Sequence, residues 1–354
     1  MDKHITHISL CTVCMNRLNH LRQTLLKNLE DNARYPSLEF VLLDYNSSDG
    51  LQEWVRDNLQ SYIKSGRLVY FHAAEPQYFH RSHSRNLAFR LASGDIVCNI
   101  DADNFTGPEF SFYLNSHFNE HKNSFLTVNF HDQENINRDT YGRIACRKKD
   151  FYLIRGFDER MEGYGYEDLD FCERLKSSGI KEYFIDREEF LNSIRHDDSA
   201  RIEFEKDAGQ DADIFIQWIS PFASRILYLF PGQRFSLGKL LDQHEGFGNP
   251  VLEGGKWIMG TWTRKPGLVN LQPESEQSQK FNEVQSGNLV DIRNETLYRI
   301  TDREFIRELR MNYPIITNHQ YYLNNKHSAK IQVNPDGCGR GKVVKNFMEK
   351  IYFG

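Results

Sequence analysis

Hydrophobic positions in the first part of the chain alternate between short β-rich runs and helical stripes. Residues 8–14 and 39–44 are nearly continuous apolar runs, which predicts buried strands. Between them Leu18, Leu21 and Leu25 recur at helical spacing, which predicts an amphipathic helix. The alternation continues through these predicted elements: a helix over 51–63, a strand over 67–71, a helix over 82–93 and a strand over 95–100.

Strands that alternate with helices predict an α/β fold with a mainly parallel sheet flanked by helices, because right-handed crossovers return each strand in the same direction. In such sheets ligands bind beyond the carboxyl ends of the strands. Polar residues occupy those ends here: Asp44 begins the turn 45–50, and Asp101-Ala102-Asp103 follows the strand over 95–100. We therefore expect a polar site at this edge of the sheet.

Asp101 and Asp103 stand one residue apart at a predicted strand end. Two carboxylates in that arrangement can share one divalent cation, directly or through its water shell. Hard oxygen ligands suit Mg²⁺ or Mn²⁺, which pair with diphosphates. An isolated Asp-x-Asp is usually a solvated turn, so the position at the end of a strand is what favours a metal.

A second polar stretch runs from Gly156 to Asp170 and holds Gly-Phe-Asp-Glu followed by Gly-Tyr-Gly-Tyr-Glu-Asp-Leu-Asp. Glycine allows a ligand to approach the backbone, and Tyr164 and Tyr166 can offer ring faces and hydroxyls to a carbohydrate. Glu167 and Asp168 stand at a predicted helix start, where negative charge is stabilised. An isolated Glu-Asp pair is more often an acidic helix cap, so its context decides between the two interpretations.

The helix that follows is predicted to bury the face of Asp168, Phe171 and Leu175. On another face Asp170 and Arg174 form an i,i+4 pair, which we expect to contribute only about 0.2–0.5 kcal/mol. Residues 176–179 should close this helix.

The order of these motifs resembles the GT-A glycosyltransferases of family 2. The similar segments are the turn that begins at Asp44, the pair Arg85-Asn86, the Asp-x-Asp of Asp101 and Asp103, and the stretch from Gly156 to Asp170. The last of these is similar to the signature of the galactosyltransferase and chondroitin-polymerase branch. The resemblance covers about residues 8–198 and implies a GT-A fold there.

For the donor side, the resemblance implies that Asp44 contacts the uracil or ribose of a UDP-sugar and that Arg85 lies near the base or the diphosphate. Asp103 would be the direct ligand of the cofactor Mn²⁺ or Mg²⁺. Asp101 would assist through the ribose or a water molecule. His196 would complete the metal site, since imidazole suits ions like Mn²⁺.

For the acceptor side, the resemblance implies that Asp168 is the general base, with Glu167 and Tyr164 orienting the acceptor and Tyr166 also binding it. Two positions depart from the family pattern, which often has Asp in place of Tyr45 and Gly in place of Arg155. Neither departure removes a proposed catalytic group.

The implied function is a metal-dependent, inverting transfer of Gal, GalNAc or GlcNAc from a UDP-sugar to a hydroxyl of an oligosaccharide or lipid-linked glycan, in bacterial surface polysaccharide synthesis. Two alternatives stay open. A nucleotidyltransferase would also use carboxylates and a metal, but residues 14–19 after the first strand are not glycine-rich. A glycan-binding or scaffold protein with a decayed catalytic site is the other, and the intact Asp101, Asp103, Asp168 and His196 argue against it.

Composition narrows the class further. The chain has 354 residues and a formal net charge of -5 without a basic block, which disfavours nucleic-acid binding. Residues 1–7 lack the pattern of a signal peptide, and no window has the length of a membrane span. The 6 cysteines are scattered and are expected to be reduced. We expect a cytoplasmic protein, with a peripheral position at the inner membrane face as an alternative.

The pattern predicts a catalytic domain over 1–205, a helical extension over 206–245 and a small β-rich domain of unknown role over 246–354. Within the extension, residues 212–230 fit an amphipathic helix interrupted by Pro221. That helix is expected to pack on the catalytic domain or a second copy of the chain, with membrane contact as an alternative. Later predicted elements are strands over 256–262 and 267–271, a helix that begins near Thr301 and runs to Arg310, and a strand that leads to a turn over 331–337.

Overall fold

The computed structural model describes residues 4–129, 139–195, 203–206, 212–242, 250–328 and 330–353. The chain forms two compact units. One unit comprises Met1–Gly163, Glu167–Lys206 and Asn325–Gly354, and we call it the sheet unit. The other comprises Tyr164–Tyr166 and Asp207–Asn324, and we call it the barrel unit.

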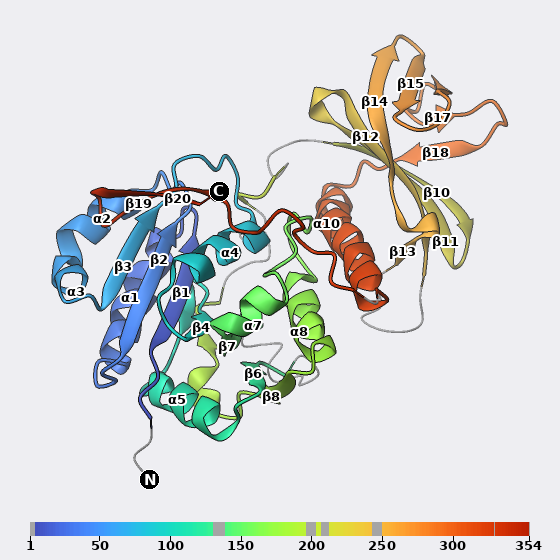
Figure 1. Ribbon diagram of the computed structural model, residues 1–354. Coiled ribbons are helices and arrows are strands. Elements are labelled where there is room, and N and C mark those ends of the chain that lie inside the picture. The colour runs from blue at the N-terminus through green and yellow to red at the C-terminus, as the bar shows by residue number, and fades with distance from the viewer. Residues whose placement is uncertain are drawn as a thin grey trace. The chain divides into compact units, whose positions relative to one another are not determined.

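The sheet unit is built on a mixed sheet with strand order β20-β19-β3-β2-β1-β4-β7-β6-β8 (Figure 1). Its central strands are parallel, as predicted, and Cys14, Asp44 and His72 stand in register at their carboxyl ends. The bounds are β1 (Ile8–Cys14), β2 (Leu38–Asp44), β3 (Leu68–His72), β4 (Ile96–Asn99), β6 (Ser124–Thr127), β7 (Ala145–Arg147), β8 (Lys181–Phe184), β19 (Gly341–Lys345) and β20 (Glu349–Phe353). A separate short pair joins β5 (Asn104–Phe105) to β9 (Asn192–Ser193).

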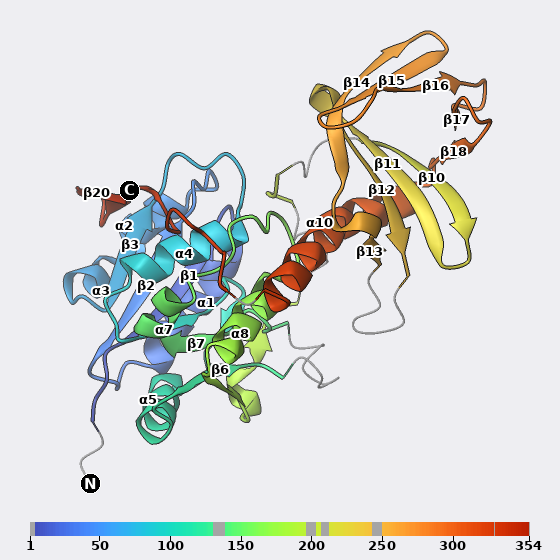
Figure 2. The ribbon, with the colours of Figure 1, turned by 45° about the vertical axis from the view of Figure 1, so that its right-hand side comes forward.

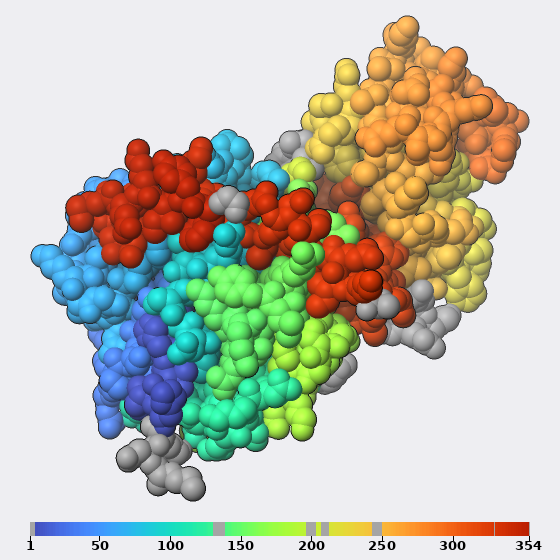
Figure 3. Space-filling model, in the orientation of Figure 1, coloured from blue at the N-terminus to red at the C-terminus, as the bar shows by residue number. Residues whose placement is uncertain are grey.

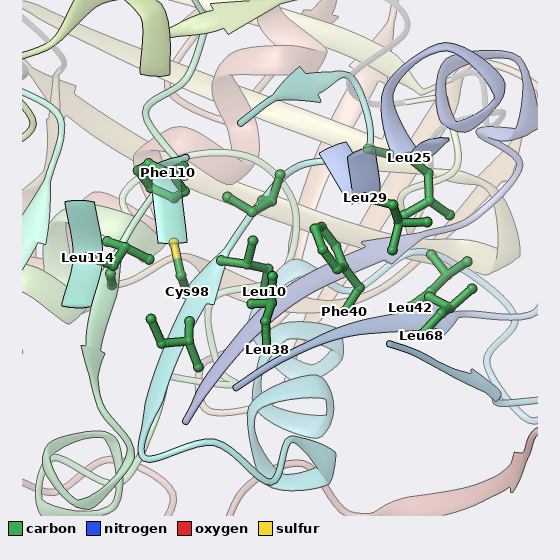
Figure 4. Close-up of a cluster of buried hydrophobic side chains, with 14 of the residues drawn as sticks. Leu10, Leu25, Leu29, Leu38, Phe40, Leu42, Leu68, Cys98, Phe110 and Leu114 are labelled. Carbon is green, nitrogen blue, oxygen red and sulfur yellow. The ribbon is translucent and has the colours of Figure 1, made fainter. Parts of the chain in front are cut away.

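Helices cover both faces of this sheet, because side chains that alternate along each strand are buried on both sides. One face packs on α1 (Leu18–Asp31), α2 (Leu51–Asn58) and α5 (Phe110–Glu120), and Figure 4 shows Leu10, Phe40 and Leu42 directed into that cluster. The other face packs on α4 (Arg81–Leu91), α7 (Lys148–Leu153) and α8 (Glu167–Ser177). The helix predicted over 51–63 is divided, with α3 (Gln60–Lys64) following α2 after Leu59.

The segment from residue 330 to 353 belongs to the sheet unit, so the predicted domain over 246–354 is wrong for this part. Its strand β19 pairs antiparallel with β3, and Phe347 stacks on Tyr70 with ring centroids 4.9 Å apart. In Figure 3 this segment lies in red across the surface of the sheet unit. Of the strand and turn predicted over 331–337, the turn is confirmed, because the Gly337 N–H donates a hydrogen bond of 3.0 Å to the Asn334 carbonyl. The strand is wrong, because side-chain hydrogen bonds from Asn334 hold that run in place of a strand ladder.

The barrel unit is an antiparallel barrel. Its strand order is β11-β10-β18-β17-β16-β15-β14-β12-β13, and a β11–β12 pairing closes the ring. The bounds are β10 (Asp213–Ser220), β11 (Ala223–Phe230), β12 (Arg234–Leu241), β13 (Val251–Leu252), β14 (Ile258–Lys265), β15 (Leu268–Pro273), β16 (Gln279–Glu283), β17 (Leu289–Val290) and β18 (Thr296–Arg299). The strands predicted over 256–262 and 267–271 are confirmed as β14 and β15.

A long helix, α10 (Arg303–Lys326), packs on the outside of the barrel (Figures 1 and 2). Leu309 and Ile316 of α10 share a buried cluster with Tyr228 and Trp257. The helix begins where the sequence predicts it, since Asp302 Oδ1 accepts a hydrogen bond of 2.8 Å from the Phe305 N–H and caps it. It continues well beyond Arg310, where the predicted helix ends.

The helix predicted over 212–230 is wrong, because this stretch is the hairpin of β10 and β11 with Pro221 in its turn. Phe215 points into the barrel core, whereas Ile214 packs in the cluster shared with α10. A strand buried on both faces is apolar at every position, so it cannot be told from a helix by periodicity. At the hairpin tip Trp218 stays 68% exposed.

Candidate active site

The turn after β2 is held by Asp44, which is fully buried. Its Oδ1 accepts a hydrogen bond of 2.8 Å from the Ser47 N–H, and its Oδ2 accepts one of 2.7 Å from the Tyr70 hydroxyl. Burial and the Asp44 charge raise the pKa of Tyr70, so this phenol stays protonated as a donor. Asp44 therefore shapes the turn, and its contact with a nucleotide stays a prediction.

The same turn is tied to the start of α1. Asn16 Oδ1 accepts a hydrogen bond of 2.7 Å from the Ser48 N–H, and Asp49 Oδ2 accepts one of 2.8 Å from the Leu18 N–H. Tyr45, a departure from the family pattern, is buried with its hydroxyl 2.7 Å from His83 Nδ1. The loop is thus fixed to its surroundings before any ligand is added.

Asp101 and Asp103 lie in the turn between β4 and β5, at the carboxyl edge predicted for them. Helix α1 supports this turn from below. Thr24 Oγ1 donates a hydrogen bond of 2.7 Å to the Ala102 carbonyl, and Asn28 Nδ2 donates one of 2.9 Å to the Asn104 carbonyl. The two carboxylates are therefore carried by a rigid turn.

These two carboxylates suit a hard divalent cation, since such ions are commonly bound by one or two carboxylates with substrate phosphates and water. The Asp101 side chain is 31% exposed, so it can be reached from solvent. Among the described residues no group of three or more His, Cys, Asp or Glu side chains converges on one point. The acidic pair would accordingly need ligands from a substrate or from outside those residues.

His196 lies outside the described residues, and its predicted role as a metal ligand stays a prediction. The chain just before it is placed, because the Ile194 N–H donates a hydrogen bond of 2.8 Å to the Asp103 carbonyl. Ser193 pairs with Asn104 in the same short sheet.

Arg85 occupies the centre of the site and is only 5% exposed. Its Nη1 lies 2.8 Å from Asp168 Oδ1 and 3.3 Å from Glu167 Oε1. Its Nη2 lies 3.3 Å from Asp101 Oδ1. One guanidinium thus joins the Asp-x-Asp turn to the start of α8, which brings together the two motifs singled out in the sequence.

The pKa values of two carboxyl groups in this cluster, Asp168 and Asp101, shift in opposite directions. Burial raises the pKa of Asp168 to about 7, and the nearby Glu167 carboxylate adds to the rise while Arg85 opposes it. Burial acts the same way on Asp101, but there Arg85 and Asn99 outweigh it and hold the pKa below its usual value. At neutral pH Asp101 is an anion, whereas Asp168 is balanced between accepting and releasing a proton.

Asn86, the neighbour of Arg85, holds the Gly-Phe-Asp-Glu turn. Its Oδ1 accepts from the Phe157 N–H at 2.7 Å, and its Nδ2 donates to Glu159 Oε1 at 2.8 Å. Gly156 has φ +71°, and a Cβ there would lie 2.4 Å from Asn86 Oδ1, so only glycine fits. Arg155 also has a positive φ, 64°, at the position where the family often has glycine.

Asp170 and Arg174 do not form the weak surface pair expected from the sequence. Both are buried, and Arg174 Nη1 also donates to the Ile154 and Gly156 carbonyls at 2.7 and 2.6 Å. Asn325 Nδ2 donates to Asp170 Oδ1 at 2.8 Å. Asp170 is therefore a buried anchor of the turn before α8.

Tyr164 and Tyr166 belong to the barrel unit, although they directly precede Glu167 in the chain. Tyr164 is half-buried, whereas Tyr166 is 9% exposed and stacks on His319 of α10 with ring centroids 4.5 Å apart. Acceptor binding by both tyrosines stays a prediction, and the ring of Tyr166 already has a partner.

Two residues of this site were not predicted from the sequence. Gly142 lies against the central ion pair, since a Cβ there would be 2.4 Å from Asp101 Oδ2 and 2.8 Å from Arg85 Nη2. Arg143 is fully buried, and burial lowers its pKa to about 10. In the sequence, the adjacent Gly142 and Arg143 were the local feature that could have drawn attention to this part of the site. The residues of α1 that hold the Asp-x-Asp turn, Thr24 and Asn28, could have been recognised as polar residues spaced four apart beside the leucine stripe.

A comparison with protein families adds an independent observation. Residues 9–177 match the model described as glycosyl transferase family 2. This range is a little under half of the chain, and it is similar to that family. The matched range contains the turn after Asp44, Arg85, the Asp-x-Asp and the start of α8, and its mixed α/β sheet is of the GT-A type. The specific branch named by the resemblance is not distinguished by this match.

Solved structures give weaker likenesses. A mannosyltransferase from Pyrobaculum calidifontis, solved with GDP-Man and Mn²⁺, is 18% identical, with 51% of this chain and 55% of that chain covered and a TM-score of 0.44. TarS 1–349 of S. aureus is 15% identical, with 51% and 58% covered and a TM-score of 0.41. The catalytic domain of Drosophila β1,4-galactosyltransferase 7, solved with xylobiose, is 15% identical, with 54% and 72% covered and a TM-score of 0.38.

The matches to the first two structures span little more than half of those proteins. With these low TM-scores, none of the three assigns a function to this chain. A comparison with curated proteins finds no match.

Two further expectations concern the cysteines and membrane-spanning helices. All of the cysteines are unpaired and buried, which confirms the expectation of free thiols. Within the described ranges, no helix has the length and apolar character needed to cross a membrane.

Proposed function

We propose that this protein is a metal-dependent, inverting glycosyltransferase that moves a sugar from a UDP-sugar to a hydroxyl of a glycan. The observation that carries the proposal is the Arg85 bridge, in which one guanidinium contacts both Asp101 and Asp168. A donor-side carboxylate and an acceptor-side carboxylate are thereby held at a fixed separation. That arrangement is useful when two substrates must meet in one orientation.

On the donor side, Asp103 and Asp101 would hold Mn²⁺ or Mg²⁺, with His196 as a further ligand, and Asp44 would face the nucleoside. When bound, the cation would offset the negative charge that develops on the departing diphosphate. The residues themselves supply a rigid turn, supported by Thr24 and Asn28.

On the acceptor side, Asp168 is proposed to accept the proton of the attacking hydroxyl. The oxygen forms a bond to the anomeric carbon as the bond from that carbon to the diphosphate oxygen breaks, and the electron pair leaves with UDP. A carboxylate with a pKa of about 7 is well matched to this task, because a base works best near the working pH. Glu167 and Tyr164 would orient the acceptor.

The sugar is proposed to be Gal, GalNAc or GlcNAc, and the product part of a bacterial surface polysaccharide made on the cytoplasmic side. A peripheral membrane contact or a contact with a second copy would use the hairpin tip, where Trp218, Ile219 and Phe222 are exposed. These finer assignments rest on the resemblance in the sequence.

A donor-hydrolysis screen tests the proposal. The protein is incubated with UDP-Gal, UDP-GalNAc and UDP-GlcNAc, each with Mn²⁺ and then with a chelator, and released UDP is measured. We expect release from one donor that stops when the metal is removed. Absence of metal-dependent release from every donor would favour the glycan-binding alternative, and release of pyrophosphate from UTP with a sugar phosphate would favour a nucleotidyltransferase.

A further inference from the structure

The loop that precedes the proposed base is held by helix α10. Tyr164–Tyr166 cluster with the barrel unit, whereas the residues on either side, Gly163 and Glu167, cluster with the sheet unit. The chain therefore leaves one unit for these residues and returns at the first residue of α8. Whatever fixes Tyr166 acts on Glu167 through a single peptide bond and on Asp168 through two.

The loop is anchored to α10 through its backbone at Gly165. Asn318 Nδ2 donates a hydrogen bond of 2.9 Å to the Gly165 carbonyl, and Asn318 is fully buried. Gly165 has φ +103°, and a Cβ there would lie 3.2 Å from Ile315 Cγ1. This positive φ favours glycine, and with a Cβ present Ile315 would have to shift by a few tenths of an ångström.

A second anchor holds Tyr166 through its ring. Tyr166 stacks on His319 at 4.5 Å with an interplanar angle of 13°, and Tyr322 lies one helical turn beyond at 5.5 Å from Tyr166. Tyr166 has φ +69°, a backbone conformation that costs a non-glycine residue free energy. Packing of its ring therefore compensates for a strained backbone immediately before the start of α8.

His319 is suited to this role in its neutral form. Burial lowers its pKa, and a hydrogen bond with the Pro250 backbone opposes that shift. Proline has only a carbonyl to offer, so the imidazole must be the donor. A neutral ring stacks without placing a charge among the aromatic side chains of α10.

From these contacts we propose that α10 is the acceptor-side scaffold, in which Asn318 and His319 are positioning residues that fix Gly165 and Tyr166 and through them Glu167 and Asp168. The barrel unit would thus control transfer to the acceptor and leave use of the donor unaffected. This inference rests on the proposed function, and it deepens it by assigning the barrel unit a role.

The test compares His319→Ala and His319→Phe with a matched control, His327→Ala, whose side chain is exposed just beyond α10. Phenylalanine retains a flat ring that can stack on Tyr166, so His319→Phe should keep the transfer activity that His319→Ala loses. Two rates are measured with the UDP-sugar found in the hydrolysis screen: UDP release to water alone, and transfer to a panel of p-nitrophenyl monosaccharides.

We expect His319→Ala to reduce the ratio of transfer to hydrolysis about tenfold, with the donor KM unchanged, and His319→Phe to stay within about twofold of the wild type. In the control His327→Ala the ratio of transfer to hydrolysis should equal that of the wild type. An unchanged ratio in His319→Ala, or equal losses of transfer and hydrolysis, would overturn the inference.

Amide hydrogen exchange over 163–170 gives a readout that does not depend on activity. His319→Ala should exchange about two- to tenfold faster there, the effect expected from the loss of one stacked pair, while β10 and β11 keep their protection. Unchanged exchange over 163–170 would overturn the inference even in an active enzyme. If the wild-type protein neither hydrolyses nor transfers any donor, the proposed function fails, and exchange still decides whether α10 holds the loop.

Discussion

Arg85 Nη1 donates to Asp168 Oδ1 at 2.8 Å, and the two residues are 83 positions apart in the chain. The guanidinium has two roles in this contact. Its charge keeps part of the Asp168 population ionised in a buried site, and its fixed fork sets the direction of the carboxylate. Catalysis by Asp168 would therefore depend on a side chain from another helix.

Replacing the proposed base should abolish transfer and retain donor binding. Asp168→Asn keeps the size of the side chain and removes its ability to take a proton, so the transfer rate should fall by about 10²- to 10⁴-fold. UDP affinity, measured by calorimetry with Mn²⁺, should stay within about twofold of wild type. Asp57→Asn, at an exposed position of α2, is the control. Near-normal turnover in Asp168→Asn would remove the assignment of the base.

The acid limb of the pH profile should move in opposite directions in two variants. The base must be unprotonated, so kcat/KM should rise with pH through the Asp168 pKa of about 7. Glu167→Gln removes a neighbouring negative charge, which lowers that pKa and moves the limb to lower pH. Arg85→Gln removes the stabilising cation, which raises the pKa and moves the limb to higher pH.

Each of these shifts should be about one pH unit or more. Glu173→Gln serves as the control for Glu167→Gln, because Glu173 lies on the same helix and pairs with Lys176. Shifts in the same direction in Glu167→Gln and Arg85→Gln would show that another group governs the limb.

Gly142→Ala should damage the site more than the fold. The added Cβ would meet Asp101 Oδ2 and Arg85 Nη2, both ends of side chains that can move, so the fold should lose no more than about 1 kcal/mol. Displacement of the ion pair should reduce kcat/KM by about tenfold or more. Gly341→Ala is the matched control, since its Cβ would lie 3.8 Å from Leu87 Cδ2. Equal activity in the two variants would contradict this prediction.

Asn334→Ala should destabilise the sheet unit. Its amide donates to the Arg155 and Phe157 carbonyls at 2.8 and 2.6 Å and accepts from the Glu159 N–H at 3.1 Å. Loss of these buried hydrogen bonds should cost about 2–4 kcal/mol of unfolding free energy, measured by hydrogen exchange of β1 and β2. Asn19→Ala, exposed on α1, is the control. If Asn334→Ala lowers the unfolding free energy no more than Asn19→Ala does, the segment after residue 330 does not support the turn.

The parallel strands of the sheet unit were predictable because each is a mostly apolar run followed by polar residues. The Asp-x-Asp turn and the acidic start of α8 were predictable as motifs for the same reason. The barrel strands β10 and β11 were not, since Ile214 and Phe215 are buried on opposite faces and imitate a helix.

The partners of the motifs could not be obtained from local patterns. Asp170 and Arg174 have the spacing of a weak pair, but distant groups make them a buried network: Asn325, 155 positions from Asp170, and the carbonyls of the turn before α8. The same holds for Gly142, whose importance comes from its distance to Asp101. Periodicity reports which face of an element is buried, but it does not report what lies against that face.

The placement of β19 beside β3 has a consequence for biosynthesis. Asn346 Oδ1 accepts a hydrogen bond from the Tyr70 N–H, a partner 276 positions earlier. During translation the edge of β3 therefore stays unpaired until the whole barrel unit has been made. An open strand edge can pair with other chains. A chain whose synthesis stops within the barrel unit would carry a sheet unit with an exposed β3 edge and without Asn334 and Asn325.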